Sequence, residues 1–381
     1  MQFAQIAGQS AVKEHLVQSV KNGRIPHAQL FLGAEGSGSL PLAVAYAQFI
    51  SCENKGENDS CGVCASCRKY EKFAHPDLHF SYPFFAKDKS DTALTFVAEW
   101  RELFLEKPYF SFEDWRGRFD ATNKQANINI AECHQIIKKL SLKPFESAYK
   151  VLILWLPEYL DKEGNTLLKI IEEPSPNTLF ILVAENQDEI LSTILSRTQL
   201  VKIPRLAQQE VSGWLVKEKN LDAVQADSVA YLAEGSLSRA LELSAHTENA
   251  FHTLFVDWMR GCYANKMAEV FPIVDKLADA GRETQKNFLQ YGISLMREVM
   301  IMQSGAGAMI RLPEAEMTFV KRFSPHIFLA QSEAVAAEFE KACFHLERNV
   351  NQKILFLDVS LQLVKILKYQ SIPSGTPYII V

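Results

Sequence analysis

The stretch HAQLFLGAEGSGSLPLAVAYAQFIS, residues 27–51, contains the pattern from which the fold can be inferred. An apolar run typical of a buried strand, residues 28–32, leads into a glycine-rich turn, and a helical stretch follows. A phosphate-binding loop of the form G-x-x-x-x-G-K-[ST] has this setting: its backbone amides surround the phosphates, its lysine reaches the β- and γ-phosphates, and its hydroxyl holds Mg²⁺. The turn therefore predicts the shape of such a loop.

The loop keeps its glycines but lacks the residues that bind a nucleotide productively. Gly33 and Gly38 occupy the two glycine positions, and Gly36 lies between them. Ser39 stands at the position of the lysine and Leu40 at that of the hydroxyl. We interpret the stretch as a degenerate phosphate-binding loop; from the loop alone, a glycine-rich turn of unrelated origin is the alternative.

The other half of an ATPase site would follow the continuous apolar run YKVLILWL, residues 149–156, which is typical of a strand buried on both faces. Acidic residues are needed there to hold Mg²⁺ and to activate water. Trp155 and Leu156 occupy these positions, and Glu158 lies too far along the chain. The residues that bind and hydrolyse ATP are thus missing from both halves of the site in the same chain. This coincidence favours an ATPase that has lost its activity; an unrelated glycine-rich loop is the less favoured interpretation.

Strand and helix patterns alternate over residues 1–204, which predicts an α/β domain with a parallel sheet and helices on both faces. Strands are expected at 28–32 and within 75–83, 149–156, 177–185 and 198–204. Helices are expected at 10–23, 39–51, 129–143 and 161–173.

Two regions depart from this alternation. Residues from 84 to about 127 are rich in aromatic and charged side chains, and we interpret them as a partly helical surface insertion. After Pro204 the strand patterns stop, and short amphipathic helices are expected over 205–247. A helical domain is expected over 248–381, with longer helices that reach about residue 370. The tail 371–381 is too short to assign.

Four of the seven cysteines, Cys52, Cys61, Cys64 and Cys67, form the pattern C-x8-C-x2-C-x2-C. In a reducing compartment such clustering indicates a metal rather than disulfides. Four thiolates with no open position describe a structural Zn²⁺ site. Free thiols, a redox pair or an iron–sulfur cluster are the alternatives. The other cysteines, Cys133, Cys262 and Cys343, are interpreted as small buried residues.

Composition excludes some classes of protein. The chain has 381 residues, 48% hydrophobic and 22% charged, with a net charge of −5, which argues against a broad basic surface that grips nucleic acid. No signal peptide is visible, and the longest apolar run, residues 40–50, is too short to span a bilayer. A cytosolic protein with no membrane partner is expected.

Several stretches together resemble a known family. They are IAGQSAVKEHL, IPHAQLFLGAEGSG, the cysteine cluster followed by HPDLH, NTLLKIIEEPSPNTLFILVAENQDEILSTILSRTQ, and GSLSRAL. In order and spacing they are similar to the delta-prime subunits of the bacterial DNA polymerase III clamp loader, members of the AAA+ superfamily. The resemblance covers about residues 3–245, apart from the insertion.

The resemblance implies an AAA+ α/β domain at 1–204, which contains the zinc module already expected at 52–67, a small helical lid at 205–247, and a helical collar at 248–381 for oligomerisation. It also implies a non-hydrolysing stator in a five-subunit ring with motor ATPase subunits and an opening subunit. That ring loads the sliding clamp onto primed DNA. The component itself would bind structural zinc and no ATP.

The resemblance also assigns roles to individual residues. The family's Ser-Arg-Cys motif maps onto Ser196, Arg197 and Thr198, with threonine in place of the cysteine, and Arg197 would act in trans on ATP bound by a neighbouring subunit. Arg239 matches the sensor-2 position, where a salt bridge or partner contact is expected in a chain without a working loop. Asn186 is expected to be a turn residue. The paired carboxylates Glu172 and Glu173 are interpreted as structural.

Two other functions are consistent with parts of the sequence. An active AAA+ ATPase with an unorthodox loop would bind nucleotide as an isolated chain. A zinc-knuckle protein that binds nucleic acid would show salt-dependent binding, although the knuckle CGVCASCRKYEK carries few basic residues.

Overall fold

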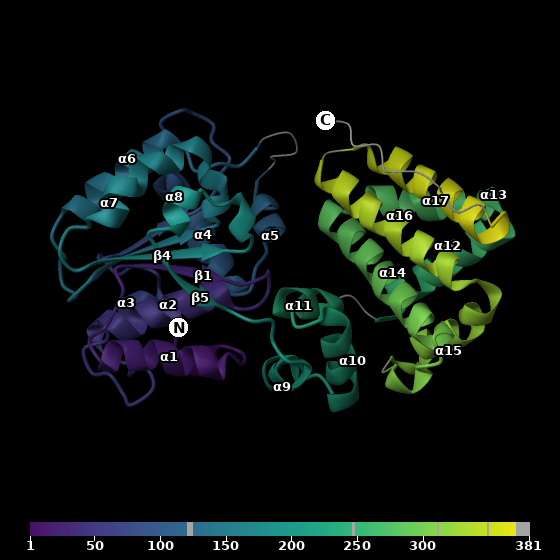
Figure 1. Ribbon diagram of the computed structural model, residues 1–381, viewed down its shortest axis with the longest axis horizontal. Helices are drawn as coiled ribbons and strands as arrows, with labels where there is room; N and C mark the ends of the chain where they lie inside the picture. The colour runs from purple at the N-terminus through teal and green to yellow at the C-terminus, as the bar shows by residue number, and fades with distance from the viewer. Residues whose placement is uncertain (120–124, 246–247, 311, 349, 371–381) are drawn as a thin grey trace. The chain divides into compact units, whose positions relative to one another are not determined.

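The computed structural model describes residues 1–119, 125–245, 248–310, 312–348 and 350–370 (Figure 1). The chain divides into two compact units: Met1–Asn220 with Glu234–Ser238, and Leu221–Ala233 with Arg239–Val381. The residues expected to form a lid are thus shared between the units. The expected boundary at 247 and the tail 371–381 lie outside the described residues.

A five-stranded parallel sheet forms the centre of the first unit, with the order β2-β3-β4-β1-β5. Each strand falls within a predicted range: β1 (Ala28–Leu32), β2 (Leu78–Ser81), β3 (Lys150–Trp155), β4 (Thr178–Ala184) and β5 (Gln199–Lys202). Every residue of β3 and β4 is buried, because helices cover both faces of the sheet. In register, Leu32 pairs with Ala184 and Trp155 with Val183, so the carboxyl ends of β1, β4 and β3 lie side by side.

Helices cover both faces of the sheet (Figure 1). Phe31, Ile153 and Val183 point to one face and Leu30, Leu152 and Leu182 to the other, as the alternation of side chains along a strand requires. The first face carries α1 (Ser10–Lys21), α2 (Ser39–Ser51), α3 (Ala65–Glu71), α4 (Val97–Glu106) and α5 (Phe112–Arg116). The second carries α6 (Ile130–Ser141), η3 (Pro157–Leu167), α7 (Leu168–Glu172) and α8 (Ser192–Leu195).

The expectation of a surface insertion at 84–127 is wrong in one respect. The segment is partly helical, as expected, but its aromatic side chains belong to the main core: Phe84, Trp100 and Trp115 are fully buried. The backbones of Phe84 and Asn127 exchange hydrogen bonds of 3.1 and 3.2 Å, which closes the segment at its two ends. Residues 120–124 lie outside the described part.

The helix expected at 161–173 is also only partly right. A 3₁₀ helix, η3, runs from Pro157 to Leu167, and Asp161 within it has non-helical backbone angles (φ 44°, ψ −142°). Only α7 at the end of this stretch is α-helical.

The remainder of the described chain is helical. The helices are α9 (Gln208–Lys219), α10 (Ala223–Ala233), α11 (Leu237–Ala245), α12 (Glu248–Ala264), α13 (Met267–Asp279), α14 (Arg282–Gln303), α15 (Glu314–Phe323), α16 (Leu329–Glu347) and α17 (Gln352–Lys368). A core separate from that of the sheet unites α12 to α17 around Trp258, Phe288 and Phe339. Within the described ranges, no helix has the length and apolar character that crossing a membrane requires.

Candidate functional site

The glycine-rich turn lies between β1 and α2. Its backbone takes left-handed angles at Gly36 (φ 75°) and Gly38 (φ 89°), and α2 begins directly after Gly38. A Cβ atom at Gly36 would lie 2.1 Å from the Ser236 hydroxyl oxygen, so only glycine fits there. The Gly33 N–H donates to the Ala184 carbonyl at 3.1 Å, which anchors the turn to the end of β4.

The side chains of the turn bond to each other. The hydroxyls of Ser37 and Ser39 lie 2.9 Å apart, and both residues are buried. Leu40, at the position where a hydroxyl would hold Mg²⁺, is also buried. The first turn of α2 therefore offers neither a cationic nor a metal-binding side chain to a phosphate.

Aromatic side chains from the 84–127 segment occupy the space over the turn. The gap that remains is about 30 Å³ and is lined in part by Tyr109, Phe110 and Trp155. That is room for about two water molecules, whereas small-molecule sites measure about 300–1,000 Å³. The chain's own side chains therefore leave little empty space over this turn.

Tyr109 connects three parts of the first unit. Its hydroxyl accepts a hydrogen bond of 2.9 Å from the Ala7 N–H. Its ring lies edge-on to that of Trp214 in α9, with centroids 5.8 Å apart. A Cβ atom on Gly38 would lie 3.2 Å from its Cε1, so the ring approaches the turn itself. One buried side chain thus touches the segment before α1, the glycine-rich turn and α9.

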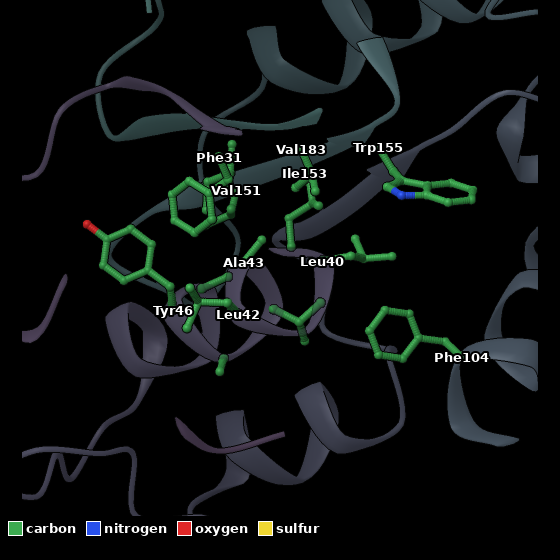
Figure 2. Close-up of a cluster of buried hydrophobic side chains, with 14 of the residues drawn as sticks. Phe31, Leu40, Leu42, Ala43, Tyr46, Phe104, Val151, Ile153, Trp155 and Val183 are labelled. Carbon is green, nitrogen blue, oxygen red and sulfur yellow. The ribbon is translucent and has the colours of Figure 1, made fainter. Parts of the chain in front are cut away.

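The end of β3 is apolar where a hydrolase would place acids. Trp155 lies on the same side of the sheet as Leu40 and Phe104 (Figure 2). Its ring centroid is 5.0 Å from that of Phe110 and 5.2 Å from that of Trp100. Aromatic side chains therefore cluster at the carboxyl end of β3, and positions 155 and 156 hold tryptophan and leucine, not acidic residues.

Glu158, the next carboxylate along the chain, bonds to the residues that follow β4. Its Oε1 accepts hydrogen bonds from the N–H groups of Glu185 (2.6 Å) and Asn186 (2.8 Å), and burial raises the pKa of its carboxyl group. Asn186 caps η4 (Gln187–Glu189) by accepting from the Asp188 N–H, so it is the turn residue that the sequence predicts.

Arg197 lies just after α8 and before β5, on the surface. Its Nε donates to Glu172 Oε2 at 3.0 Å, and its Nη1 donates to the Thr193 carbonyl at 3.0 Å and to the Ser196 hydroxyl at 3.3 Å. The side chain is 32% exposed. The half-buried guanidinium is thus oriented by contacts with α7 and α8, and Glu172 contacts it in addition to ending α7.

Arg239 lies in α11 and bonds to α14. Its Nη2 donates to the Ser294 hydroxyl at 3.0 Å and to the Gln290 carbonyl at 3.3 Å, both in α14. The preceding residues contact the turn through the backbone, since the Leu237 N–H donates to the Gly36 carbonyl at 2.9 Å. The stretch that resembles a sensor therefore contacts the turn through the backbone of Leu237, and its arginine bonds to α14.

The four clustered cysteines come together as the sequence predicts. The Sγ atoms of Cys52, Cys61, Cys64 and Cys67 all lie within 4.8 Å of one another. Tetrahedral Zn–S bonds of about 2.3 Å require S···S separations of about 3.8 Å. The Cys52–Cys61 and Cys61–Cys67 separations are 3.5 and 4.0 Å, so the four residues fit a tetrahedral metal ion.

Backbone N–H groups point at three of these sulfurs, while burial raises the pKa of the Cys52 and Cys67 thiols. The N–H groups of Cys61, Cys64 and Cys67 point at the sulfurs of Cys52, Cys61 and Cys64 at 3.3–3.4 Å. Backbone N–H groups of Val63 and Cys64 lower the pKa of Cys61 to about 6. Four cysteine sulfurs this close could hold a metal ion, and four soft thiolates are consistent with zinc.

The cysteine cluster is also tied to the start of the chain. The Asp59 carboxylate, in the loop between the first two cysteines, accepts from the N–H groups of Phe3 (3.1 Å) and Ala4 (2.9 Å). The Gln2 side chain donates to the Ser60 carbonyl at 2.6 Å. The loop that a metal would fix therefore also fixes the segment before α1.

Sequence reasoning missed Tyr109 and Phe110. No motif marks them, and the only signal was their place in an aromatic-rich segment with no helical or strand period. It also missed the contact between Arg197 and Glu172, because 25 residues separate the two and neither lies in a local motif of charges.

A sequence model of the family described as "DNA polymerase III, delta subunit" matches residues 8–207. The chain is 25% identical over 243 residues to the DNA polymerase III subunit delta' of Bacillus subtilis, covering 64% of this chain and 61% of that protein. It is 27% identical over 257 residues to the DNA polymerase III subunit gamma of Buchnera aphidicola, covering 65% of this chain and 59% of that protein.

The chain thus matches less than two thirds of the length of these relatives. Among solved structures, the Bacillus subtilis DNA clamp loader delta protein covers 93% of this chain and 99% of its own, at 13% identity and a TM-score of 0.35.

Proposed function

Because the chain belongs to the DNA polymerase III delta subunit family, and is a clamp-loader subunit of the AAA+ type, we propose that it serves as a non-hydrolysing stator of that assembly. Its role would be to hold the neighbouring subunits in place while they bind and hydrolyse ATP. The partners of this proposal are the motor subunits and the opening subunit of a ring, together with the sliding clamp and primed DNA.

The observation that carries the proposal is the aromatic filling over the glycine-rich turn. The gap of about 30 Å³ leaves no space for a nucleotide. Opening it would mean removing Tyr109 from its hydrogen bond and its ring contacts, and burying an unpaired Ala7 N–H costs about 1–3 kcal/mol. A subunit whose site is filled by its own side chains does not change shape with the ATP cycle, which suits a stator.

Arg197 supports the second part of the proposal, that this chain acts on a neighbour's ATP. A half-buried guanidinium that is held by Glu172 and Thr193 is oriented before any partner arrives. Arginine presents a planar fork of donors that matches phosphate oxygens, and in trans it stabilises the charge that develops during phosphoryl transfer. We assign this role to Arg197, with Ser196 orienting it.

Zinc completes the proposal as a structural cofactor. Cys52, Cys61, Cys64 and Cys67 would hold the ion, and its contribution would be folding energy for the knuckle rather than chemistry. The chain's own part is to supply four thiolates and the Asp59 contacts that join the knuckle to the segment before α1.

Calorimetric titration of the isolated chain with Mg-ATP tests the proposal. We expect no heat of binding up to millimolar nucleotide, whereas a motor subunit titrated in parallel binds. A dissociation constant below about 1 mM, equivalent to about −4 kcal/mol, would contradict the stator function and favour an active ATPase with an unorthodox loop.

A further inference from the structure

A groove in the second unit lies between α12 and α15 and has a volume of about 510 Å³. On α12 it is lined at the spacing i, i+4, i+7, i+8, i+11 and i+12, from His252 to Ala264. On α15 the spacing is i, i+3, i+4, i+7 and i+8, from Ala315 to Phe323. Such spacings are single helical faces, and at a rise of 1.5 Å per residue the α12 face is about 18 Å long.

The floor of the groove is apolar. Val256 and Met259 are buried at its base, and the rings of Phe319 and Phe323 stack with centroids 5.1 Å apart and an interplanar angle of 17°. A face of this kind normally packs against another helix. Both walls of the groove are helices, whose backbone groups bond within the helix. They therefore offer no backbone groups with which a partner strand could pair.

The rim of the groove is basic. Arg322 is exposed, and within the described residues it has no carboxylate partner. Arg260 lies on the opposite wall and is 71% exposed, with Asp257 at 3.6 Å. His326 is exposed at one end, and His252 lies at the other, hydrogen-bonded to the Tyr291 hydroxyl at 2.9 Å. The buried carboxylate beneath, Glu316, has its Oε1 4.0 Å from His252 Nδ1, so the positive charge of the rim comes from Arg260 and Arg322.

We propose that this groove binds an amphipathic helix of a partner protein, about three turns long, with leucine or aromatic anchors on one face and acidic residues beside them. The apolar floor takes anchors at i, i+3, i+4 and i+7, and the arginines on both walls select the acidic flanks. Two arginines beside an apolar floor suit a peptide better than nucleic acid, whose backbone requires a row of cations. The proposal does not depend on the stator function or on the filled nucleotide site.

The test uses the full chain and two labelled peptides of about 16 residues, which differ only in carrying glutamate or lysine beside a common leucine face. Fluorescence anisotropy gives the dissociation constants. We expect the acidic peptide to bind in the micromolar range and the basic one at least about tenfold more weakly.

Three variants locate the binding. Arg322→Glu should weaken the acidic peptide about tenfold and strengthen the basic one, because attraction becomes repulsion at that rim. Lys321→Glu makes the same charge change on the next, exposed residue outside the groove, and should leave both constants unchanged. Ala264→Trp, at an exposed rim position, should block both peptides, and circular dichroism checks that each variant is folded.

Several results would overturn the proposal. They are equal binding of the two peptides, equal effects of Arg322→Glu and Lys321→Glu, or the absence of binding to the folded chain. Salt-dependent binding of single-stranded DNA that is lost in Arg322→Glu would assign the groove to nucleic acid instead. A dimer that Ala264→Trp dissociates would assign it to a second copy of the chain.

Discussion

The backbone N–H of Ala7 donates a 2.9 Å hydrogen bond to the hydroxyl of Tyr109, 102 residues later in the chain. Here a tyrosine from an inserted segment joins the start of the chain, the glycine-rich turn and α9. The side chain is covalently part of the protein, so this link is independent of any ligand concentration.

Removing Tyr109 should therefore destabilise the first unit. Tyr109→Ala leaves a cavity and an unpaired N–H and should lower the free energy of unfolding by about 3–5 kcal/mol, as for other large aromatic residues. Tyr109→Phe keeps the ring and should cost only about 1–2 kcal/mol, through the lost hydrogen bond. Urea titration followed by tryptophan fluorescence measures both. Equal stabilities of the two variants would show that the ring does not fill the site.

Restoring the lysine alone should not restore nucleotide binding. Ser39→Lys supplies the charge but leaves the aromatic filling in place, so we expect no binding of Mg-ATP. In Ser39→Lys combined with Tyr109→Ala, weak binding should appear, because space and charge are then both present. Hydrolysis should remain absent in both variants, since Trp155 and Leu156 stand where the acids are needed. Calorimetry and phosphate release are the measurements, and ATP binding by the single variant would contradict the argument.

Zinc should be present at one ion per chain and should stabilise the start of the chain. Elemental analysis measures the first quantity. Chelation, or Cys64→Ser with Cys67→Ser, should release the Asp59 loop and accelerate amide hydrogen exchange at Phe3 and Ala4, which donate to Asp59. Cys343→Ser, which changes a cysteine of the second unit, is the control. If amide exchange at Phe3 and Ala4 did not change after complete loss of the metal, the metal would not be what stabilises the start of the chain.

Stability should fall between pH 6.5 and pH 4. Burial, with Lys139 nearby, lowers the pKa of His79 from 6.5 to about 4 in the folded chain. The unfolded chain therefore binds more protons in this window, so the free energy of unfolding decreases as the pH falls, by at most about 1.4 kcal/mol per pH unit. His79→Gln should flatten the curve of stability against pH, and exposed His15→Gln should not. Parallel curves for His79→Gln and the unmodified chain would rule out His79 as the source.

Local pattern was sufficient for the sheet and the cysteine cluster, and insufficient for the filled site. The strands around residues 28–32 and 150–155 are continuous apolar runs, and the cysteine spacing is short, so each is defined by neighbours in sequence. The role of Tyr109 and Phe110 depends on Ala7 and Trp155, which are distant in sequence. From the sequence alone, an aromatic-rich segment with no helical or strand period indicates a surface loop. Only its contacts with residues distant in sequence show that it is buried.

The 3₁₀ conformation of η3 was not predictable for a related reason. The sequence predicts a helix over 161–173, whereas the chain forms a 3₁₀ helix from Pro157 to Leu167 and is α-helical only in α7. Its path is decided instead by tertiary contacts: Glu158 bonds to the end of β4, and the Tyr159 carbonyl accepts from the Ile128 N–H at 2.9 Å. These contacts hold the backbone in a tighter helix than its sequence favours.

Arg197 gives the sharpest prediction about function. If its guanidinium reaches the γ-phosphate of a neighbour's ATP, Arg197→Ala should reduce clamp-dependent ATP hydrolysis and clamp loading by the reconstituted complex while zinc content, folding and assembly stay intact. Arginine fingers contribute about 10³–10⁵ in rate at the site that they serve. The loss in total hydrolysis should be smaller, because other sites of a ring keep their own arginines. Arg197→Lys should restore little, since an ammonium lacks the planar fork.

Two further variants separate a role in trans from a structural one. Glu172→Gln keeps an oxygen that can accept from Arg197 Nε but removes the ion pair, which is exposed and contributes less than about 1 kcal/mol, so stability should hardly change. Clamp-dependent hydrolysis should change only slightly, because the Thr193 carbonyl still orients the guanidinium. Arg205→Ala, another exposed arginine of the first unit, is the matched control and should load clamps normally. Normal loading by Arg197→Ala as well would return Arg197 to the status of a solvated surface residue.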